Sequence, residues 1–151
     1  LGVNFDNKRI LTSLIDVSTI SPDELRICPC YFQQYIDKEY EVRANVIGNK
    51  VYACKIESQK SNLTKIDWRN YDIQNTPHEL IILPQKINSA CVDIVKQLNL
   101  NFGAIDLIVT PAGEYFFLEC NSQAHWLWIE ELIELPLTKY IVDSMINVGF
   151  S

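Results

Sequence analysis

Two segments in the last third of the chain predict a β-hairpin. Residues 103–109 and 115–121 are rich in β-branched, aromatic and other apolar side chains. The five residues between them, Thr-Pro-Ala-Gly-Glu, are typical of a turn. With residues 111–114 as the loop, Thr110 pairs with Tyr115, and this register constrains every other pair in the hairpin.

The predicted register places two carboxylates opposite each other. Asp106 faces Glu119, and Asn121, two residues further on, points to the same side of the sheet. Opposed side chains have Cβ atoms about 5 Å apart, and two carboxylates at that distance repel by about 3 kcal/mol at an effective dielectric near 20. A cation between them would remove this cost, and such oxygen ligands suit Mg²⁺. The residues alone are equally compatible with two solvated acids and no metal.

Apolar residues flank the acids on both faces of the predicted strands. One face is wholly apolar and comprises Ile105, Leu107, Leu118 and Cys120. On the other face, the residues beside the acids are Ala104, Ile108 and Phe117. We therefore expect both strands to be buried on both sides, where an acid needs a partner.

The composition indicates one globular domain. The 151 residues are 48% hydrophobic and 21% charged, which is enough for a core. The net charge of −6 argues against nucleic acid as the main partner, although a metal and a few local cations could still bind a nucleotide. There is no apolar run of membrane-spanning length and no signal-peptide pattern. Five cysteines without a CxxC pair indicate reduced thiols in a cytoplasmic protein.

Other elements are predicted along the chain. In chain order they are a short helix from Ser21, a strand at 31–36, a hairpin at 41–47 and 51–56 around Gly48–Asn49, a helix at 85–99 and a helix at 138–147. The strand at 41–47 places Glu41 and Arg43 on one face. Residues 57–77 are polar and irregular, and a loop of this length is usually functional or mobile.

This order of elements resembles the C-terminal half of an ATP-grasp ligase, of the microviridin and graspetide type that modifies ribosomally made peptides. The strings that carry the resemblance are residues 32–43 (FQQYIDKEYEVR), 67–69 (DWR), 100–106 (LNFGAID), 117–121 (FLECN) and 126–131 (WLWIEE). It implies an α+β fold, the C-terminal part of an ATP-grasp fold, with a mostly antiparallel sheet and packed helices. It also implies two parts. Residues 1–37 would be the end of the central subdomain with the hinge strand, and residues 38–151 the C-terminal subdomain.

The resemblance implies a nucleotide site. Gln34, Tyr35 and Ile36 match the hinge strand whose backbone holds adenine, and Glu41 matches a residue that accepts from the ribose or orders the site. From the pattern alone, residues 34–36 are equally well an ordinary buried strand and Glu41 a surface acid.

The resemblance also implies catalytic and metal-binding roles. Arg43 and Arg69 would bind the γ-phosphate or the acyl phosphate, since a guanidinium binds phosphate oxygens with two donors. Asp106, Glu119 and Asn121 match the Mg²⁺ ligands. Without the family, Arg43 is a surface residue and Arg69 a solvated loop residue that packs on Trp68 through a cation–π contact.

The implied activity is ATP- and Mg²⁺-dependent ligation of a carboxylate to an amine or hydroxyl through an acyl phosphate. The expected partners are ATP and a precursor peptide, with a second copy of the chain (a homodimer) as a further candidate; neither nucleic acid nor a membrane is expected. The alternatives are an amino-acid or glutathione-synthetase-like ligase and a non-catalytic nucleotide- or peptide-binding module. Residues 122–125, Ser-Gln-Ala-His, depart from the Pro and Gly-Gln of the family. Family members are also longer, so we expect a fragment that is inactive alone.

Overall fold

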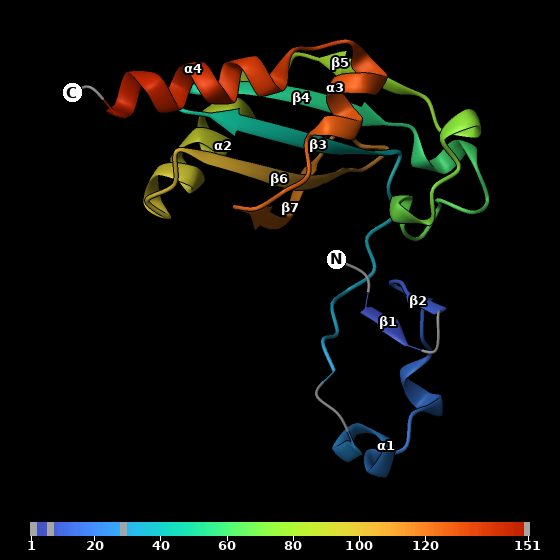
Figure 1. Cartoon of the computed structure of the whole chain (residues 1–151). Coiled ribbons are helices and arrows are strands. Elements are labelled where there is room, and N and C mark those ends of the chain that lie inside the picture. Colours follow the sequence, from blue (N-terminus) through green and yellow to red (C-terminus); the bar gives the residue numbers. More distant parts are fainter. Residues whose placement is uncertain (1–2, 6–7, 28–29, 150–151) are drawn as a thin grey trace.

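The computed structural model describes residues 3–5, 8–27 and 30–149, which form a layered α+β body with a smaller N-terminal segment beside it (Figure 1). The helices are α1 (Pro22–Ile27), α2 (Gln85–Gln97), α3 (Leu127–Ile133) and α4 (Leu137–Gly149). The strands are β1 (Val3–Phe5), β2 (Lys8–Ile10), β3 (Tyr40–Ile47), β4 (Lys50–Ile56), β5 (His78–Ile81), β6 (Phe102–Val109) and β7 (Tyr115–Asn121). No helix in the described part of the chain is long and apolar enough to cross a membrane.

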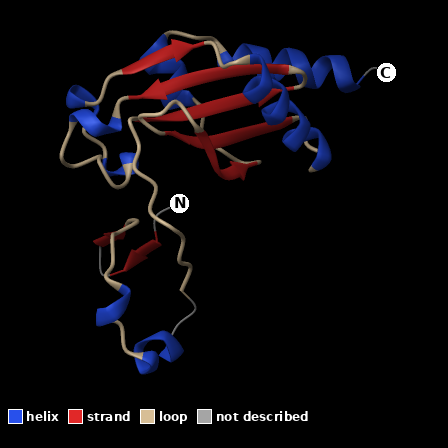
Figure 2. Cartoon of the chain, turned by 180° about the vertical axis from the view of Figure 1, so that it is seen from behind, coloured by secondary structure: helices blue, strands red, loops and turns tan. Residues whose placement is uncertain are grey.

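Five strands form one sheet in the order β5-β4-β3-β6-β7, and every neighbouring pair is antiparallel (Figure 2). The predicted fold class is therefore confirmed. The hairpin of β3 and β4 is also confirmed, with Ile47 paired to Lys50 and Gly48 at a φ of 58°, a conformation that glycine adopts without steric cost. Strand β5 was not predicted, because four residues are too short for a clear alternation.

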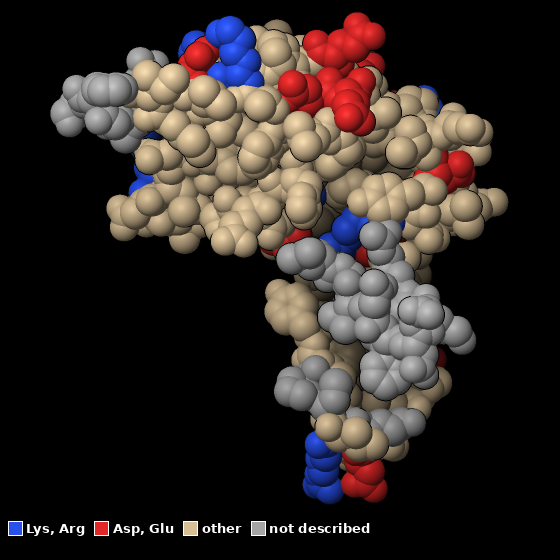
Figure 3. All heavy atoms as spheres, in the orientation of Figure 1, with Lys and Arg blue, Asp and Glu red and all other residues tan. Residues whose placement is uncertain are grey.

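The N-terminal segment contains the small β1–β2 hairpin and α1, and it joins the sheet through an extended connector. The helix predicted from Ser21 is confirmed, with Pro22 at its first position. The strand predicted at residues 31–36 is wrong, because the structure describes no strand there and no neighbouring strand with which it could pair. Acidic and basic atoms show together where this segment meets the sheet (Figure 3).

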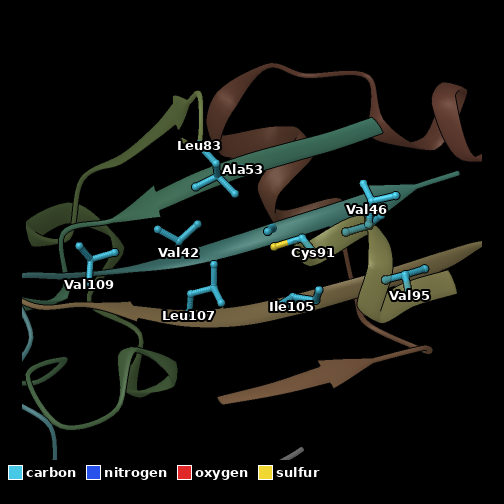
Figure 4. Packing of buried hydrophobic residues seen from close by; sticks show 11 residues of the cluster. Val42, Val46, Ala53, Leu83, Cys91, Val95, Ile105, Leu107 and Val109 are labelled. Atoms are coloured by element: carbon cyan, nitrogen blue, oxygen red, sulfur yellow. The ribbon is translucent and has the colours of Figure 1, made fainter. Parts of the chain in front are cut away.

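Two hydrophobic clusters hold the sheet, one on each face. Alternate residues of β3 and β6 point toward α2, and the buried cluster there includes Val42, Ala44, Val46, Ile105, Leu107, Cys91 and Val95 (Figure 4). The cluster on the other face packs under α3 and α4 and includes Ile47, Cys54, Ile56, Trp68, Ile129, Leu137 and Ile141. Cys54, Cys91 and Cys120 are not in disulfides, whereas Cys28 lies outside the described residues.

The β6–β7 hairpin has the predicted pairing at its centre, but its turn and one strand differ from the prediction. Val109, not Thr110, lies opposite Tyr115, so the predicted register is wrong near the turn. A bulge at Leu118 then adds one residue to β7 and brings Asp106 opposite Glu119. The pairing of the two acids is therefore confirmed.

The bulge also changes the surroundings of the acids. Phe116, and not Phe117, lies opposite Ile108 on their face. Strand β6 is buried as expected, but β7 lies at the edge of the sheet in the described part of the chain, and Phe116 and Phe117 are 37% and 50% exposed. The expectation that both strands are buried on both sides is therefore wrong for β7.

The polar stretch at residues 57–77 is ordered by its own side chains. It contains short 3₁₀ turns at Ser58–Lys60, Trp68–Asn70 and Ile73–Asn75. The Thr64 hydroxyl donates to the Ser58 carbonyl at 2.7 Å and lies 3.2 Å from the Thr76 hydroxyl, and all three residues are buried. Buried hydroxyls thus replace the ladder that a strand would provide. We call residues 57–77 the polar loop below.

Candidate functional site

Asp106 is the centre of the candidate site. It lies in the middle of β6 on the face that carries α3 and α4, and only 8% of its surface is exposed. Its Oδ1 atom is 2.7 Å from Nε of Arg43, the residue opposite it on β3. Burial raises the pKa of Asp106 to about 7; Arg43 opposes that shift and the neighbouring Glu119 adds to it.

The other two predicted metal ligands converge on Asp106 from β7. Glu119 is directly opposite, within hydrogen-bonding reach, and the Asn121 amide donates to Glu119 Oε1 at 2.9 Å. The described residues contain no cluster of three His, Cys, Asp or Glu that could hold a metal, and the predicted set includes one carboxamide, that of Asn121. Two carboxylates and a carboxamide are a donor set that fits Mg²⁺.

Arg43 is held between an acid and an aromatic ring. Its guanidinium carbon lies 5.5 Å from the centre of the Trp68 ring, so the cation–π contact expected for Arg69 belongs to Arg43 instead. The Trp68 ring also stacks on Trp128 of α3, with centroids 4.9 Å apart. The Arg43 Nε atom is close to Asp106, but it has no well-directed hydrogen-bond partner among the described residues. Arg43 is thus a buried cation that is paired with Asp106 by charge and distance.

Arg69 lies on the polar loop and is fixed by Asp67. Its Nε and Nη2 atoms donate to the two carboxylate oxygens of Asp67 at 2.8 and 3.0 Å, and its backbone N–H donates to the same group at 3.0 Å. These bonds raise the pKa of Arg69, and the charges of Glu119 and Asp106 add to the effect. Arg69 is therefore held by Asp67 and lies near enough to the acid pair for their charges to act on it, with 35% of its side chain exposed.

The N-terminal segment contacts the site at the same Asp67–Arg69 pair. The backbone N–H of Thr12 donates to Asp67 Oδ2 at 3.2 Å, and Arg69 Nη2 donates to the Thr12 hydroxyl at 3.4 Å. The site thus lies at the junction of the two parts of the chain.

Glu41 is a buried residue and not a surface acid. It is 5% exposed, and its Oε1 atom accepts from Lys38 Nζ at 2.6 Å. Burial raises the pKa of Glu41. The charge of Lys38 and the hydrogen bonds from Lys38 and Ser58 partly offset this increase. Lys38 was not predicted from the sequence. Its spacing of three residues before Glu41 was the available signal, but this spacing is uninformative without knowing that both side chains are buried.

The predicted adenine-binding residues lie in the connector before β3. Gln34 and Tyr35 are exposed and Ile36 is half-buried. The interpretation of this segment as an ordinary buried strand is therefore wrong, and its proposed backbone contact with adenine stays a prediction.

A small cavity, partly open to solvent, lies beside the site. Its lining is mostly aromatic and apolar and comprises Trp68, Tyr71, Asp72, Ile73, Thr76, His78, Trp128 and Leu132. Trp68 lines the cavity and also contacts the guanidinium of Arg43.

Comparisons with known proteins give matches to solved structures. No protein-family model and no curated protein matches the chain. A RiPP-associated ATP-grasp ligase of Chryseobacterium gregarium, solved with ADP and a leader and core peptide, is 31% identical, with a TM-score of 0.85 over 97% of this chain and 46% of that chain.

Two macrocyclases of Microcystis aeruginosa MRC also match. MdnC, solved with precursor peptide MdnA, is 30% identical, with a TM-score of 0.62 over 74% of this chain and 34% of its own. MdnB is 30% identical, with a TM-score of 0.61 over 83% of this chain and 45% of its own. The chain spans less than half the length of each of these proteins. Over the part that it spans, the chain matches the graspetide-like ATP-grasp ligases in both fold and sequence.

Proposed function

We propose that the chain is part of an ATP- and Mg²⁺-dependent ligase that joins a carboxylate to a hydroxyl or amine of a ribosomally made peptide. One observation carries the proposal. Asp106, Glu119 and Asn121 converge beside Arg43 and Arg69 on a fold shared with ligases solved with ADP and with precursor peptides.

Each part of the site has a proposed task. Asp106, Glu119 and the Asn121 carbonyl would bind Mg²⁺ below the triphosphate, where the metal would neutralise phosphate charge. Arg43 and Arg69 would bind the transferring phosphoryl group and then the acyl phosphate, because Arg43 pairs with Asp106 and Arg69 is near enough for the charges of both acids to act on it. Support from a Mg- and ADP-bound PsnB structure is limited to the fold, since that match is 20% identical.

The proposed reaction has two steps. A peptide carboxylate attacks the γ-phosphorus of ATP, so that an acyl phosphate forms and ADP leaves. A peptide hydroxyl or amine then attacks the acyl carbon, loses its proton, and displaces phosphate to give an ester or an amide. The residues named above contribute by positioning and by charge stabilisation, so the steps need no Ser, Cys or His nucleophile.

The nucleotide would lie at the junction of the two parts of the chain. We assign residues 1–37 to the end of the central subdomain and residues 38–151 to the C-terminal subdomain. The backbone of Gln34, Tyr35 and Ile36 would hold adenine, and Glu41 would order the site through Lys38. The contact of Thr12 with the Asp67–Arg69 pair supports a site at this junction.

The test is the full-length protein incubated with ATP, Mg²⁺ and the precursor peptide encoded beside it. The expected product is a peptide that has lost water, with stoichiometric ADP, as measured by mass spectrometry and nucleotide chromatography. Glu119→Gln should abolish both products, whereas Lys139→Met, at an exposed ion pair far from the site, should leave them unchanged. ATP-dependent addition of a free amino acid would indicate the alternative ligase. Neither product from the wild type would indicate a binding module.

A further inference from the structure

Lys38 has a buried ammonium group, which is rare for lysine in a protein of this size. Only 4% of its side chain is exposed. Its Nζ atom donates to Glu41 Oε1 at 2.6 Å and to the backbone carbonyl of Ile66 at 3.1 Å. A charge buried to this degree is stable only when such partners are present.

The two partners of Lys38 belong to different parts of the site. Glu41 is on β3, on the same face as Arg43 and two residues before it. Ile66 is on the polar loop, directly before Asp67, whose carboxylate fixes Arg69 with two side-chain bonds. Lys38 therefore links the strand that carries one arginine to the loop that carries the other.

The loop has further hydrogen bonds of its own, and some of them are next to Arg69. Its buried hydroxyls join Ser58, Ser61, Thr64, Asp72 and Thr76 to one another, within the loop itself. The Lys38–Ile66 bond instead ties the loop to the sheet next to Asp67. The bond is therefore placed where it can influence how Asp67 and Arg69 lie relative to Asp106 and Glu119, which are on the sheet.

We propose that Lys38 is a positioning residue that holds the Asp67–Arg69 pair in place over the Asp106–Glu119 carboxylates by tying the polar loop to β3. The reaction that it would serve rests on the proposed function above. The claim that Lys38 orders the polar loop is independent of that function.

A single substitution of Lys38 does not isolate this effect. Lys38→Met would leave the Glu41 carboxylate buried without its cation, which destabilises the whole fold. The double variant Lys38→Met/Glu41→Gln removes both charges together, and the amide that replaces the carboxylate can still hydrogen-bond to Ser58. The matched control is Lys55→Met, which removes an ammonium paired to Glu57 at 2.7 Å and Glu79 at 3.3 Å at the base of the same loop.

The first measurement is amide hydrogen exchange of the full chain, read by mass spectrometry over residues 61–72. Protected amides there include those of Arg69, Asn70 and Tyr71. In Lys38→Met/Glu41→Gln, exchange in this segment should quicken by about tenfold or more, while β3 and β6 keep wild-type protection. In Lys55→Met the segment should change by less than about twofold. Equal rates in the two variants would overturn the proposal.

The second measurement is kinetic and uses the full-length ligase. Lys38→Met/Glu41→Gln should lower kcat about 10- to 100-fold, with the KM for ATP changed by less than about threefold. In an Arg69→Gln background the same pair should cost little more, because Lys38 acts through Arg69. Additive losses would overturn the positioning role. If the wild type shows no ATP-dependent ligation, the proposed function fails, and the exchange experiment still decides whether Lys38 orders the loop.

Discussion

The two carboxylates of the site are not equivalent, because Asp106 is buried against Arg43 whereas Glu119 is exposed. Asp106 and Arg43 are both buried and 2.7 Å apart. Asp106→Asn removes a carboxylate whose ionisation burial opposes, but it also leaves the buried Arg43 charge without a partner. We expect the second effect to be larger, so that the free energy of unfolding falls, by at most about 3 kcal/mol. Chemical denaturation of the full chain without Mg²⁺ measures this change.

Glu119→Gln is the matched control and should act in the opposite direction. Glu119 is exposed and lies next to Asp106, so its charge opposes that of Asp106. A glutamine removes the repulsion and offers Asp106 a donor. We expect unchanged or slightly higher stability without metal, by at most about 1 kcal/mol. Equal losses in the two variants would show that Arg43 is not what makes Asp106 necessary.

The residues that sequence patterns did not reveal are those whose meaning depends on tertiary contacts. Alternation along β7 predicted that Glu119 and Asn121 share a face, but their pairing with Asp106 depends on a bulge as well. The bulge at Leu118 was not predictable, because the turn pattern does not show where a strand takes up an extra residue. The contact of Arg43 with Trp68 joins a strand to a loop that is distant in sequence, and no local period encodes it.

At the scale of elements, α2 packs on β6 through a close approach at Gly103. A Cβ atom added there would lie 2.9 Å from Val95 Cγ2 and 3.0 Å from Cys120 Sγ. Gly103→Ala should therefore lower the free energy of unfolding by about 1–3 kcal/mol. Gly103→Ala/Val95→Ala should lose less than the sum of its two single variants, since the smaller side chain makes room. An additive result in denaturant unfolding would contradict this packing account.

The packing of α3 on β5 makes stability depend on pH through His78. The His78 ring packs edge-on against Trp128, with centroids 5.7 Å apart. Burial lowers the pKa of His78 below its ordinary value of 6.5, so the folded state favours the neutral ring. The stability that this gives is present above pH 6.5 and is lost as the pH falls through the lowered pKa. Unfolding measured between about pH 7.5 and pH 5 should show this loss in the wild type.

The comparison for this pH dependence is His78→Gln, which fills similar space and does not titrate. Its stability should fall less over the same range than that of the wild type. Other titrating groups change in both proteins, so the difference between the two curves isolates His78. If the two curves are parallel, the burial of His78 does not contribute to the pH dependence.

For the whole molecule, the short motifs that resemble ATP-grasp ligases were sufficient to predict the fold. They did not predict how the N-terminal segment contacts the five-stranded sheet and its polar loop. The buried residues of both hydrophobic clusters lie between Val42 and Ile141. The N-terminal segment instead exposes large apolar side chains: Leu14, Ile15, Val17, Leu25, Ile27, Tyr31, Phe32 and Tyr35. Its described side-chain bonds to the rest of the chain run from Thr12 to Asp67 and Arg69. This distribution agrees with the boundary between residues 37 and 38 that we propose from the resemblance.

The last prediction tests that boundary. A protein comprising residues 38–151 should fold alone, because it keeps both clusters, every strand of the five-stranded sheet and the Lys38–Glu41 pair. We expect cooperative thermal unfolding with a midpoint within a few degrees of that of the full chain, and lower aggregation, since the exposed apolar residues are gone. Exchange at Arg69 should quicken modestly, because the Thr12 contact is lost. Non-cooperative unfolding, or loss of protection in β3 and β6, would show that residues 1–37 belong to the same cooperative unit as the sheet.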